Sequence, residues 1–357
     1  MIKAKITKKE FGFKRPATTS RGTLLTKQVF FIVLHADDNP FVTGIGECSL
    51  FPGLSADDVP GFEETLHEIL ARINSGEDIT SESFAQWPSI NFALETAYAD
   101  LMCNGSKVLF PSEFTRGNEP IPINGLIWMD DKEGMRRQIA QKLDSGFRCL
   151  KLKIGAIDFE EELGLLRWLR MEFSASDLTL RADANGAFGV EQAPMALDRL
   201  AQLRIHSIEQ PIRPRQHEEM AKLCRTSPVP IALDEELIGI IGLEKKKRLL
   251  ECIRPQYIII KPGLLGGICE SEEWISIADA LEIGWWVTSS LETNIGLSVI
   301  AQWTFTKNAR LHQGLSTGNL FEENIPSPLT LTGENLYYSP GTTWDLSLLL
   351  HKGKQND

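Results

Sequence analysis

Three acidic residues and two lysines stand at nearly equal intervals in the middle of this chain. Asp183, Glu209 and Asp234 each close a short apolar run, while Lys153 precedes them and Lys261 follows. The four successive gaps are 30, 26, 25 and 27 residues, and each fits one strand plus one helix. In a barrel of parallel strands, that period brings all five side chains to one rim, where such barrels place their chemistry.

Eight apolar runs, separated by helix-like segments, occupy the region from residue 121 to residue 316. Strands that are buried on both faces read as near-continuous apolar runs, so the alternation predicts an α/β fold with a TIM-type (β/α)7β barrel. Amphipathic segments at 159–172 and 190–203 fit the intervening helices. The runs are INGLIWM, RCLKLKI, LTLRADA, IHSIEQP, PIALDEE, YIIIKPG, GWWVTSS and RLHQGLS.

The residues before the barrel follow a different pattern. Two strands, 29–36 and 41–48, flank the turn Asp-Asp-Asn-Pro and predict a hairpin. Helices are predicted over 55–74, with Ser55 as the N-cap, and over 90–103. We therefore predict three regions: an N-terminal α+β capping domain (1–115), the barrel (116–321), and a C-terminal segment (322–357) that returns to the cap.

Composition excludes several classes of partner. The net charge of −11 argues against a nucleic-acid surface, and the densest basic run, 244–248, is read as a solvated helix face. The six cysteines form no close pairs, which favours free thiols and a cytoplasmic protein. The N-terminus lacks the apolar region of a secretory signal, and no apolar run is long enough to cross a membrane. Whether copies of the chain form a homo-oligomer is left open.

The three acids offer hard oxygen ligands to a cation. Mg²⁺ suits such a set, with Mn²⁺ as a substitute, whereas zinc would call for His or Cys at the same strand ends. Each acid alone would be read as the cap of the following helix. Three acids at successive strand ends favour a metal site.

Lys151 and Lys153 lie on one strand, and the period of two places them on the same face. Neighbouring positive charges disfavour one another, which lowers the pKa of a lysine and lets it act as a base. Lys261 is expected on the opposite side of the rim. A lysine base beside a divalent cation points to removal of a proton α to a carboxylate.

Five motifs in this order resemble the muconate-lactonising subgroup of the enolase superfamily, over nearly the whole chain. A lysine base paired with Mg²⁺ is typical of that superfamily. Residues 44–55 also resemble the cap-domain loop that closes over substrate in this subgroup. The motifs are KLKIG (151–155), DANG (183–186), EQP (209–211), LDEE (233–236) and IKPGLLGG (260–267).

Within the subgroup, the chain most resembles the o-succinylbenzoate synthases of menaquinone biosynthesis. IKPG replaces the IKL of epimerases, and SSLETNIG (289–296) and GLSTGNLF (314–321) also favour the synthases. Dipeptide epimerases usually carry Asp-x-Asp on the last barrel strand, where this chain reads HQGLSTG. An N-acylamino acid racemase or dipeptide epimerase remains the alternative, because two lysines on opposite faces also suit a two-base exchange.

The resemblance implies a role for each charged residue. The three acids would hold Mg²⁺, and Lys153 would remove the α-proton of a small carboxylate, 2-succinyl-6-hydroxy-2,4-cyclohexadiene-1-carboxylate. Lys153 would then protonate the departing hydroxyl on the same face, a syn dehydration through an enediolate. Lys261 would stabilise the enediolate, and Lys151 would tune Lys153.

Weaker candidates surround this set. Asn185 and Glu235 are expected to orient the ligands and lysines. His206, His312 and the adjacent Trp285 and Trp286 are interpreted as structural residues. The candidates for substrate contact are Ser289, Ser290 and Glu292 at the end of the seventh strand, with helix capping an equal reading for either serine, and Thr317 and Gly318, which offer backbone N–H groups to a succinyl carboxylate.

Overall fold

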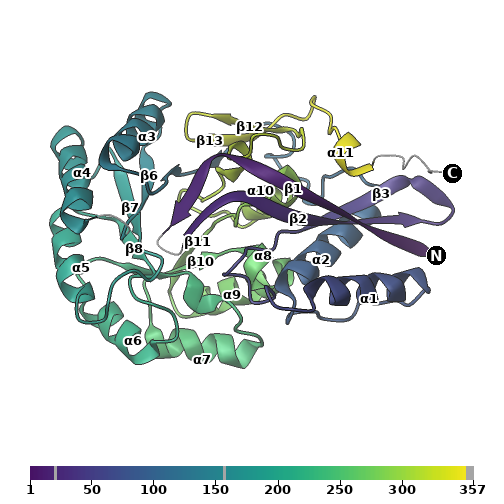
Figure 1. Ribbon diagram of the computed structural model, residues 1–357, viewed down its shortest axis with the longest axis horizontal. Coiled ribbons are helices and arrows are strands. Elements are labelled where there is room, and N and C mark those ends of the chain that lie inside the picture. The colour runs from purple at the N-terminus through teal and green to yellow at the C-terminus, as the bar shows by residue number, and fades with distance from the viewer. Residues whose placement is uncertain (20–21, 156–157, 351–357) are drawn as a thin grey trace.

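The computed structural model describes residues 1–19, 22–155 and 158–350 (Figure 1). Its centre is a sheet of seven parallel strands in the order β11-β10-β9-β8-β7-β6-β5. Strand order runs opposite to chain order without a break, so each strand lies beside its predecessor. The strands are β5 (Gly125–Ile127), β6 (Cys149–Lys153), β7 (Thr179–Asp183), β8 (Ser207–Glu209), β9 (Ile231–Leu233), β10 (Tyr257–Ile260) and β11 (Gly284–Val287).

The eighth apolar run closes the barrel without forming a full strand. Gln313 makes a parallel bridge with Ile123, just before β5, and Gly314 makes one with Thr288, just after β11. Both edges of the sheet therefore meet the same short segment. The predicted (β/α)7β barrel is confirmed, with its last strand reduced to two bridges.

Helices cover the outside of the barrel (Figure 1). Two begin at aspartates, as Asp131 accepts a hydrogen bond from Gly134 N at 2.6 Å and Asp158 accepts one from Glu160 N at 2.9 Å. Their apolar residues join those of the strands in one core. The helices are α3 (Lys132–Asp144), α4 (Phe159–Glu172), α5 (Ala193–Gln202), α6 (His217–Thr226), α7 (Leu243–Ile253), α8 (Pro262–Leu265), α9 (Ile268–Ala280) and α10 (Asn294–Thr306), with short 3₁₀ turns at Glu235–Leu237 and Thr317–Asn319.

The cap is an antiparallel sheet with two helices. β1 (Ile2–Thr19), β2 (Gly22–Ala36) and β3 (Asn39–Cys48) pair in order, so the predicted hairpin is present. The helices are α1 (Phe62–Asn74) and α2 (Pro88–Met102).

The start predicted for the first cap helix is wrong. α1 begins after Gly61 rather than at Ser55, whose hydroxyl instead accepts a hydrogen bond from Phe51 N at 2.8 Å. Pro60 disfavours helical backbone at the residue before it, and Gly61 has a φ of +93°. The helix therefore cannot extend back through these two residues.

The C-terminal segment contacts both regions. β12 (Leu329–Thr332) and β13 (Asn335–Tyr338) form a small sheet with β4 (Ile121–Pro122), which precedes the first barrel strand. α11 (Ser347–Leu350) lies beside the cap strands, and the Thr7 hydroxyl donates to the Leu349 carbonyl at 3.2 Å. The domain boundaries at 115 and 321 stay predictions.

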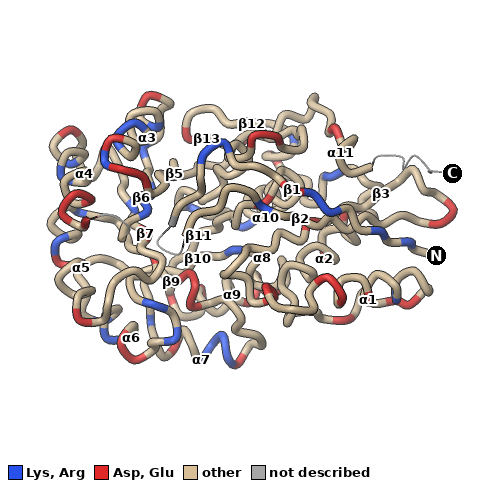
Figure 2. The backbone as a smooth tube through the Cα atoms, viewed as in Figure 1, with Lys and Arg blue, Asp and Glu red and all other residues tan. Residues whose placement is uncertain are grey.

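Charged residues are distributed along the outer helices with both signs interspersed (Figure 2). The basic run 244–248 was expected to form a solvated helix face, but one residue of this run does not face solvent. Lys246 is fully buried: its Nζ pairs with Glu270 and lies 2.8 Å from Glu273 Oε2, both on α9. Within the described residues, no helix has the length and apolar content needed to cross a membrane.

Candidate active site

The three carboxylates meet at the carboxyl ends of neighbouring strands. Asp183 ends β7, Glu209 ends β8 and Asp234 follows β9. One oxygen from each lies within 4.8 Å of the others, and all three residues are buried. Parallel pairing sets Asp183 directly opposite Glu209. This arrangement brings together three oxygen donors that would suit a single cation.

The electrostatics of Glu209 fit a divalent ion at this position. Its Oε1 is buried and has no hydrogen-bond partner among the described residues. Burial raises the pKa of Glu209 to about 7, against the opposing effect of Lys151, and the other two acids raise it further. The three lysines hold the pKa of Asp183 well below its usual range, whereas Glu209 keeps a raised pKa. A hard divalent ion beside Glu209 would favour its ionised form.

Lys153 is held by two oxygen atoms. Its Nζ donates to Asp183 Oδ2 at 2.6 Å and to Asn185 Oδ1 at 2.8 Å. Asn185 in turn donates through Nδ2 to Glu235 Oε1 at 2.8 Å, and its backbone is left-handed, with a φ of +47°. The two residues expected to orient the lysines therefore link Lys153 to the 3₁₀ turn after β9.

Lys261 approaches the carboxylates from another wall of the barrel. It follows β10, four strands from β6 in the sheet order, and its Nζ donates to Asp234 Oδ2 at 2.5 Å. Lys151 lies on the face of β6 that carries Lys153, and its Nζ contacts Asp183 Oδ2 at 2.9 Å and also pairs with Glu209. The barrel thus sets Lys153 and Lys261 on opposite sides of the acids.

The two lysines of β6 differ in proton affinity. Burial lowers the pKa of Lys153, and the charges of Lys151 and Lys261 lower it further, although Asp183 opposes them. Burial also disfavours the Lys151 ammonium, but the three carboxylates outweigh it and raise the pKa of Lys151. The expectation of a lowered pKa therefore holds for Lys153 and not for Lys151.

A small cavity of about 60 Å³, here called the catalytic pocket, opens beside these lysines. Of the proposed substrate contacts, Ser289, Ser290 and Thr317 line it, and the hydroxyls of Ser289 and Thr317 lie 2.6 Å apart. Glu292 and Gly318 are not among its lining residues. The lining is Phe51, Leu54, Asn124, Leu126, Trp128, Lys151, Lys153, Lys261, Thr288, Ser289, Ser290, Leu291, Gly314, Ser316 and Thr317.

Several lining residues were not singled out from the sequence. Phe51 and Leu54 belong to the cap loop whose resemblance to a substrate-closing loop was the only signal for them. Asn124 and Trp128 flank β5, and neither carries a charge that would mark a strand end. Their roles depend on the barrel closing beside them.

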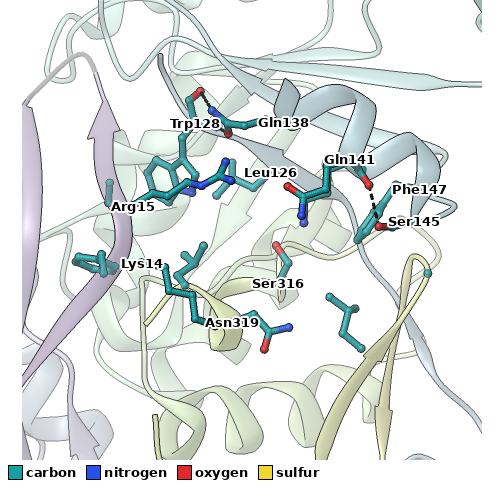
Figure 3. A pocket seen from close by; sticks show the side chains of 16 residues that line it. Lys14, Arg15, Leu126, Trp128, Gln138, Gln141, Ser145, Phe147, Ser316 and Asn319 are labelled. Carbon is teal, nitrogen blue, oxygen red and sulfur yellow. Dashed lines mark hydrogen bonds between the residues drawn. The ribbon is translucent and has the colours of Figure 1, made fainter. Parts of the chain in front are cut away.

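A larger cavity of about 550 Å³, the side cavity, adjoins the catalytic pocket and shares Leu126, Trp128 and Ser316 with it. None of the described residues that line it is an Asp or Glu, whereas three are basic. Figure 3 shows Arg15 and Gln141 reaching into this space from the cap and from α3. The lining is Phe13, Lys14, Arg15, Ala17, Leu126, Trp128, Gln138, Gln141, Lys142, Ser145, Phe147, Ser316, Asn319, Leu320, Leu331 and Gly333.

Lys142 gives this cavity a partly dehydrated positive charge. Burial lowers the pKa of Lys142, and its Nζ lies 4.7 Å from the centre of the Phe147 ring. The face of the Phe147 ring stabilises the Lys142 ammonium much less than a carboxylate would. The side cavity therefore suits an anionic group.

Comparison with known proteins agrees with this geometry. The chain matches the family described as enolase C-terminal domain-like over residues 134–340. It is 45% identical to an o-succinylbenzoate synthase of Desulfotalea psychrophila over 352 residues, covering 90% of this chain and 95% of the relative. It is 28% identical to an N-succinylamino acid racemase of Amycolatopsis sp, covering 90% of this chain and 88% of the relative.

The fold agrees as well. The crystal structure of MenC from Desulfotalea psychrophila LSv54 matches with a TM-score of 0.84 and 40% identity, covering 94% of this chain and 99% of that chain. The family match spans more than half of the sequence, and the related synthase is matched over nearly its full length. The chain therefore belongs to the enolase superfamily, among its o-succinylbenzoate synthases.

Proposed function

We propose that the protein catalyses the syn dehydration of 2-succinyl-6-hydroxy-2,4-cyclohexadiene-1-carboxylate to o-succinylbenzoate in menaquinone biosynthesis, with Mg²⁺ as its ion and Mn²⁺ as a substitute. The observation that carries the proposal is the placement of Lys153 and Lys261 on opposite sides of three buried carboxylates. The 45% identity to a synthase supports the choice of substrate.

The chain's own residues account for both proton movements. Neutral Lys153 takes the α-proton, and the C–H electron pair passes into the enediolate of the substrate carboxylate. A divalent ion held by the three acids would supply positive charge to that carboxylate. Lys153, now an ammonium, gives its proton to the hydroxyl on the same face, the C–O bond breaks, and water leaves as the ring becomes aromatic.

The neighbouring groups prepare Lys153 for this task. Asp183 and Asn185 fix the position of its Nζ, and the charge on Lys151 favours its neutral form. Lys261, on the far wall, presents an ammonium to the developing negative charge without having to move a proton.

The side cavity offers a place for the unreactive arm of this substrate. The succinyl group ends in a second carboxylate, which cannot share the centre of the three acids without repulsion. Arg15 and Lys142 would attract it into the side cavity, past the shared residue Ser316. The hydroxyls of Ser289 and Thr317 would contact the part of the substrate that stays in the catalytic pocket.

Racemisation of N-succinylamino acids is a second candidate. Two lysines facing one another would exchange the α-proton from opposite sides, and the relative from Amycolatopsis sp is named for that reaction. A succinyl arm would enter the same side cavity in either reaction. The last barrel segment, HQGLS, carries no acid to hold a free ammonium group, which disfavours dipeptides.

Ultraviolet absorbance of the cyclohexadiene substrate tests the proposal. Purified protein with Mg²⁺ should remove the diene band rapidly, and a chelator should stop the reaction. An unchanged band in the presence of Mg²⁺ would exclude the synthase activity. Deuterium exchange at the α-carbon of N-succinylamino acids would then test racemisation.

A further inference from the structure

A lysine from the cap is buried against the barrel loop that follows β11. Lys27, on β2, is 1% exposed, and its Nζ donates to the Ser290 carbonyl at 2.9 Å and the Leu291 carbonyl at 2.9 Å. It also donates to the Ser49 hydroxyl at 2.5 Å, just after β3. One ammonium therefore ties together two segments that are about 240 residues apart in the sequence.

A cap carboxylate holds the other end of the same loop. Glu47, at the end of β3, is fully buried. Its oxygens accept hydrogen bonds from Thr293 N at 2.8 Å, the Thr293 hydroxyl at 2.6 Å and Gly296 N at 2.8 Å. These donors belong to the first turn of α10 and its N-cap, so the cap sheet fixes the point where the loop becomes helix.

The held loop, residues 289–293, is strained and lines the catalytic pocket. Leu291 has a φ of +65°, a backbone region that a branched side chain rarely occupies unless its surroundings impose it. Ser289, Ser290 and Leu291 all line the catalytic pocket. The carbonyl of the strained residue is one of the groups that Lys27 holds.

The loop also packs close to the lysine on the far wall. Glu292 accepts hydrogen bonds from Ser290 N at 2.6 Å and from the Ser290 hydroxyl at 2.5 Å. A Cβ added to Gly263, two residues beyond Lys261, would lie 2.9 Å from Glu292 Oε1. Movement of the loop would therefore reach the backbone that carries Lys261.

We propose that Lys27 and Glu47 are positioning residues, which act together as a clamp from the cap that holds the strained 289–293 loop in the shape the substrate requires. Burying an ammonium and a carboxylate costs desolvation free energy, and apolar residues would fill the same space at less cost. Their placement on both ends of one pocket-lining loop gives them a function in substrate binding. Its kinetic test rests on the proposed dehydration.

Lys27→Met, which keeps the length of the side chain and removes its donors, is the first variant. We expect the KM for the cyclohexadiene substrate to rise about tenfold, the effect of losing charge-assisted hydrogen bonds, with a smaller change in kcat. Hydrogen exchange at the amides of Thr293 and Gly296 should become faster. Mg²⁺ affinity should stay unchanged, because the clamp touches none of the three acids.

Lys246→Met is the matched control. Lys246 is equally buried, but it bonds α9 on the outside of the barrel. This variant should leave the KM and the exchange of the 289–293 loop as they are in the unaltered protein, whatever its effect on thermal stability. A rise in KM in both variants would indicate general destabilisation and would contradict the proposed clamp.

Two further outcomes are decisive. A KM within about twofold of the unaltered protein for Lys27→Met, or a raised KM with unchanged loop exchange, would contradict the proposal. If Lys27→Met does not fold, Glu47→Gln, which replaces one acceptor oxygen by a donor, is judged by the same two measurements. If the unaltered protein fails to dehydrate the diene, the proposed function is lost, while loop exchange still decides whether the clamp exists.

Discussion

At the scale of single residues, the pKa values of two lysines on one strand shift in opposite directions. Lys151 contacts two carboxylates, which keep it charged, whereas Lys153 contacts Asp183 and the neutral amide of Asn185. A catalytic base must be neutral before it can accept a proton. This difference in partners is the reason we propose Lys153 as the base and Lys151 as a fixed positive charge.

Replacement of Lys153 tests this selection. Lys153→Ala should lower kcat by about 10³-fold or more, the contribution of a positioned general base, while Mg²⁺ binding measured by calorimetry persists. Lys153→Arg keeps the charge but stays protonated at every working pH, so it should be equally inactive. Normal turnover in either variant would show that another group removes the proton.

The sequence predicted charged residues well where a strand end marked them, and poorly elsewhere. Asp183 and its neighbours in the barrel follow apolar runs at a regular spacing, and this pattern alone brought them together. Lys27 and Lys246 have no such marker, because their burial depends on partners far along the chain. No residue near Lys246 in the sequence indicates that it will form an ion pair with Glu270 on another helix.

At the scale of elements, the regular helices and strands were predictable because their apolar patterns are strong. α4 was predicted with the bounds that it has, and both strands of the cap hairpin were found. The failures lie at irregular backbone, such as the start of α1 after Pro60 and Gly61. The eighth barrel run was predicted as a strand, yet it contributes only bridges at Gln313 and Gly314.

Gly314 is required by that closure. An added Cβ would lie 2.5 Å from Thr288 Oγ1 and 2.9 Å from Thr288 Cβ, its bridge partner. Gly314→Ala should therefore lower the free energy of unfolding by about 1–3 kcal/mol, as overpacking does, when measured by denaturant titration. It should also reduce turnover, because Gly314 lines the catalytic pocket.

Gly164 provides the matched comparison within α4. Apart from the backbone of its own helix and its chain neighbours, a Cβ there would meet no atom within 4 Å. Gly164→Ala should therefore raise the free energy of unfolding by about 0.5–1 kcal/mol through helix propensity. Equal effects of the two alanines would contradict the account of Gly314 as a site of close approach.

At the scale of the whole molecule, the site is assembled from regions that the sequence describes separately. The walls of the catalytic pocket include Phe51 and Leu54 from the cap and Asn124 from the start of the barrel. Local periodicity carries no information on how a cap docks, since Glu47 and Thr293 are 246 residues apart. The charged residues of the site were predictable because each one follows a recognisable strand. The shape of the pocket was not, because it depends on this long-range assembly.

Acid stability of the whole protein should depend on a histidine at the opposite end of the barrel. His206 precedes β8, and its ring stacks on Tyr257 with centroids 5.4 Å apart. Burial, followed by the charges of Arg181 and His312, lowers the pKa of His206 to about 4. The folded protein therefore keeps this ring neutral at pH values where the unfolded chain, with a pKa near 6.5, binds a proton.

The sign of the effect follows from that difference. Between pH of about 6.5 and 4 the unfolded state binds more protons, so the free energy of unfolding falls as the pH falls, by up to about 3 kcal/mol in total. His206→Phe keeps an aromatic ring against Tyr257 and removes the titration. Denaturant titrations across this range should show the unaltered protein losing stability faster than the variant. Parallel losses would mean that His206 is protonated as readily in the folded protein as in the unfolded chain, and that the carboxylates alone set the acid limit of this barrel.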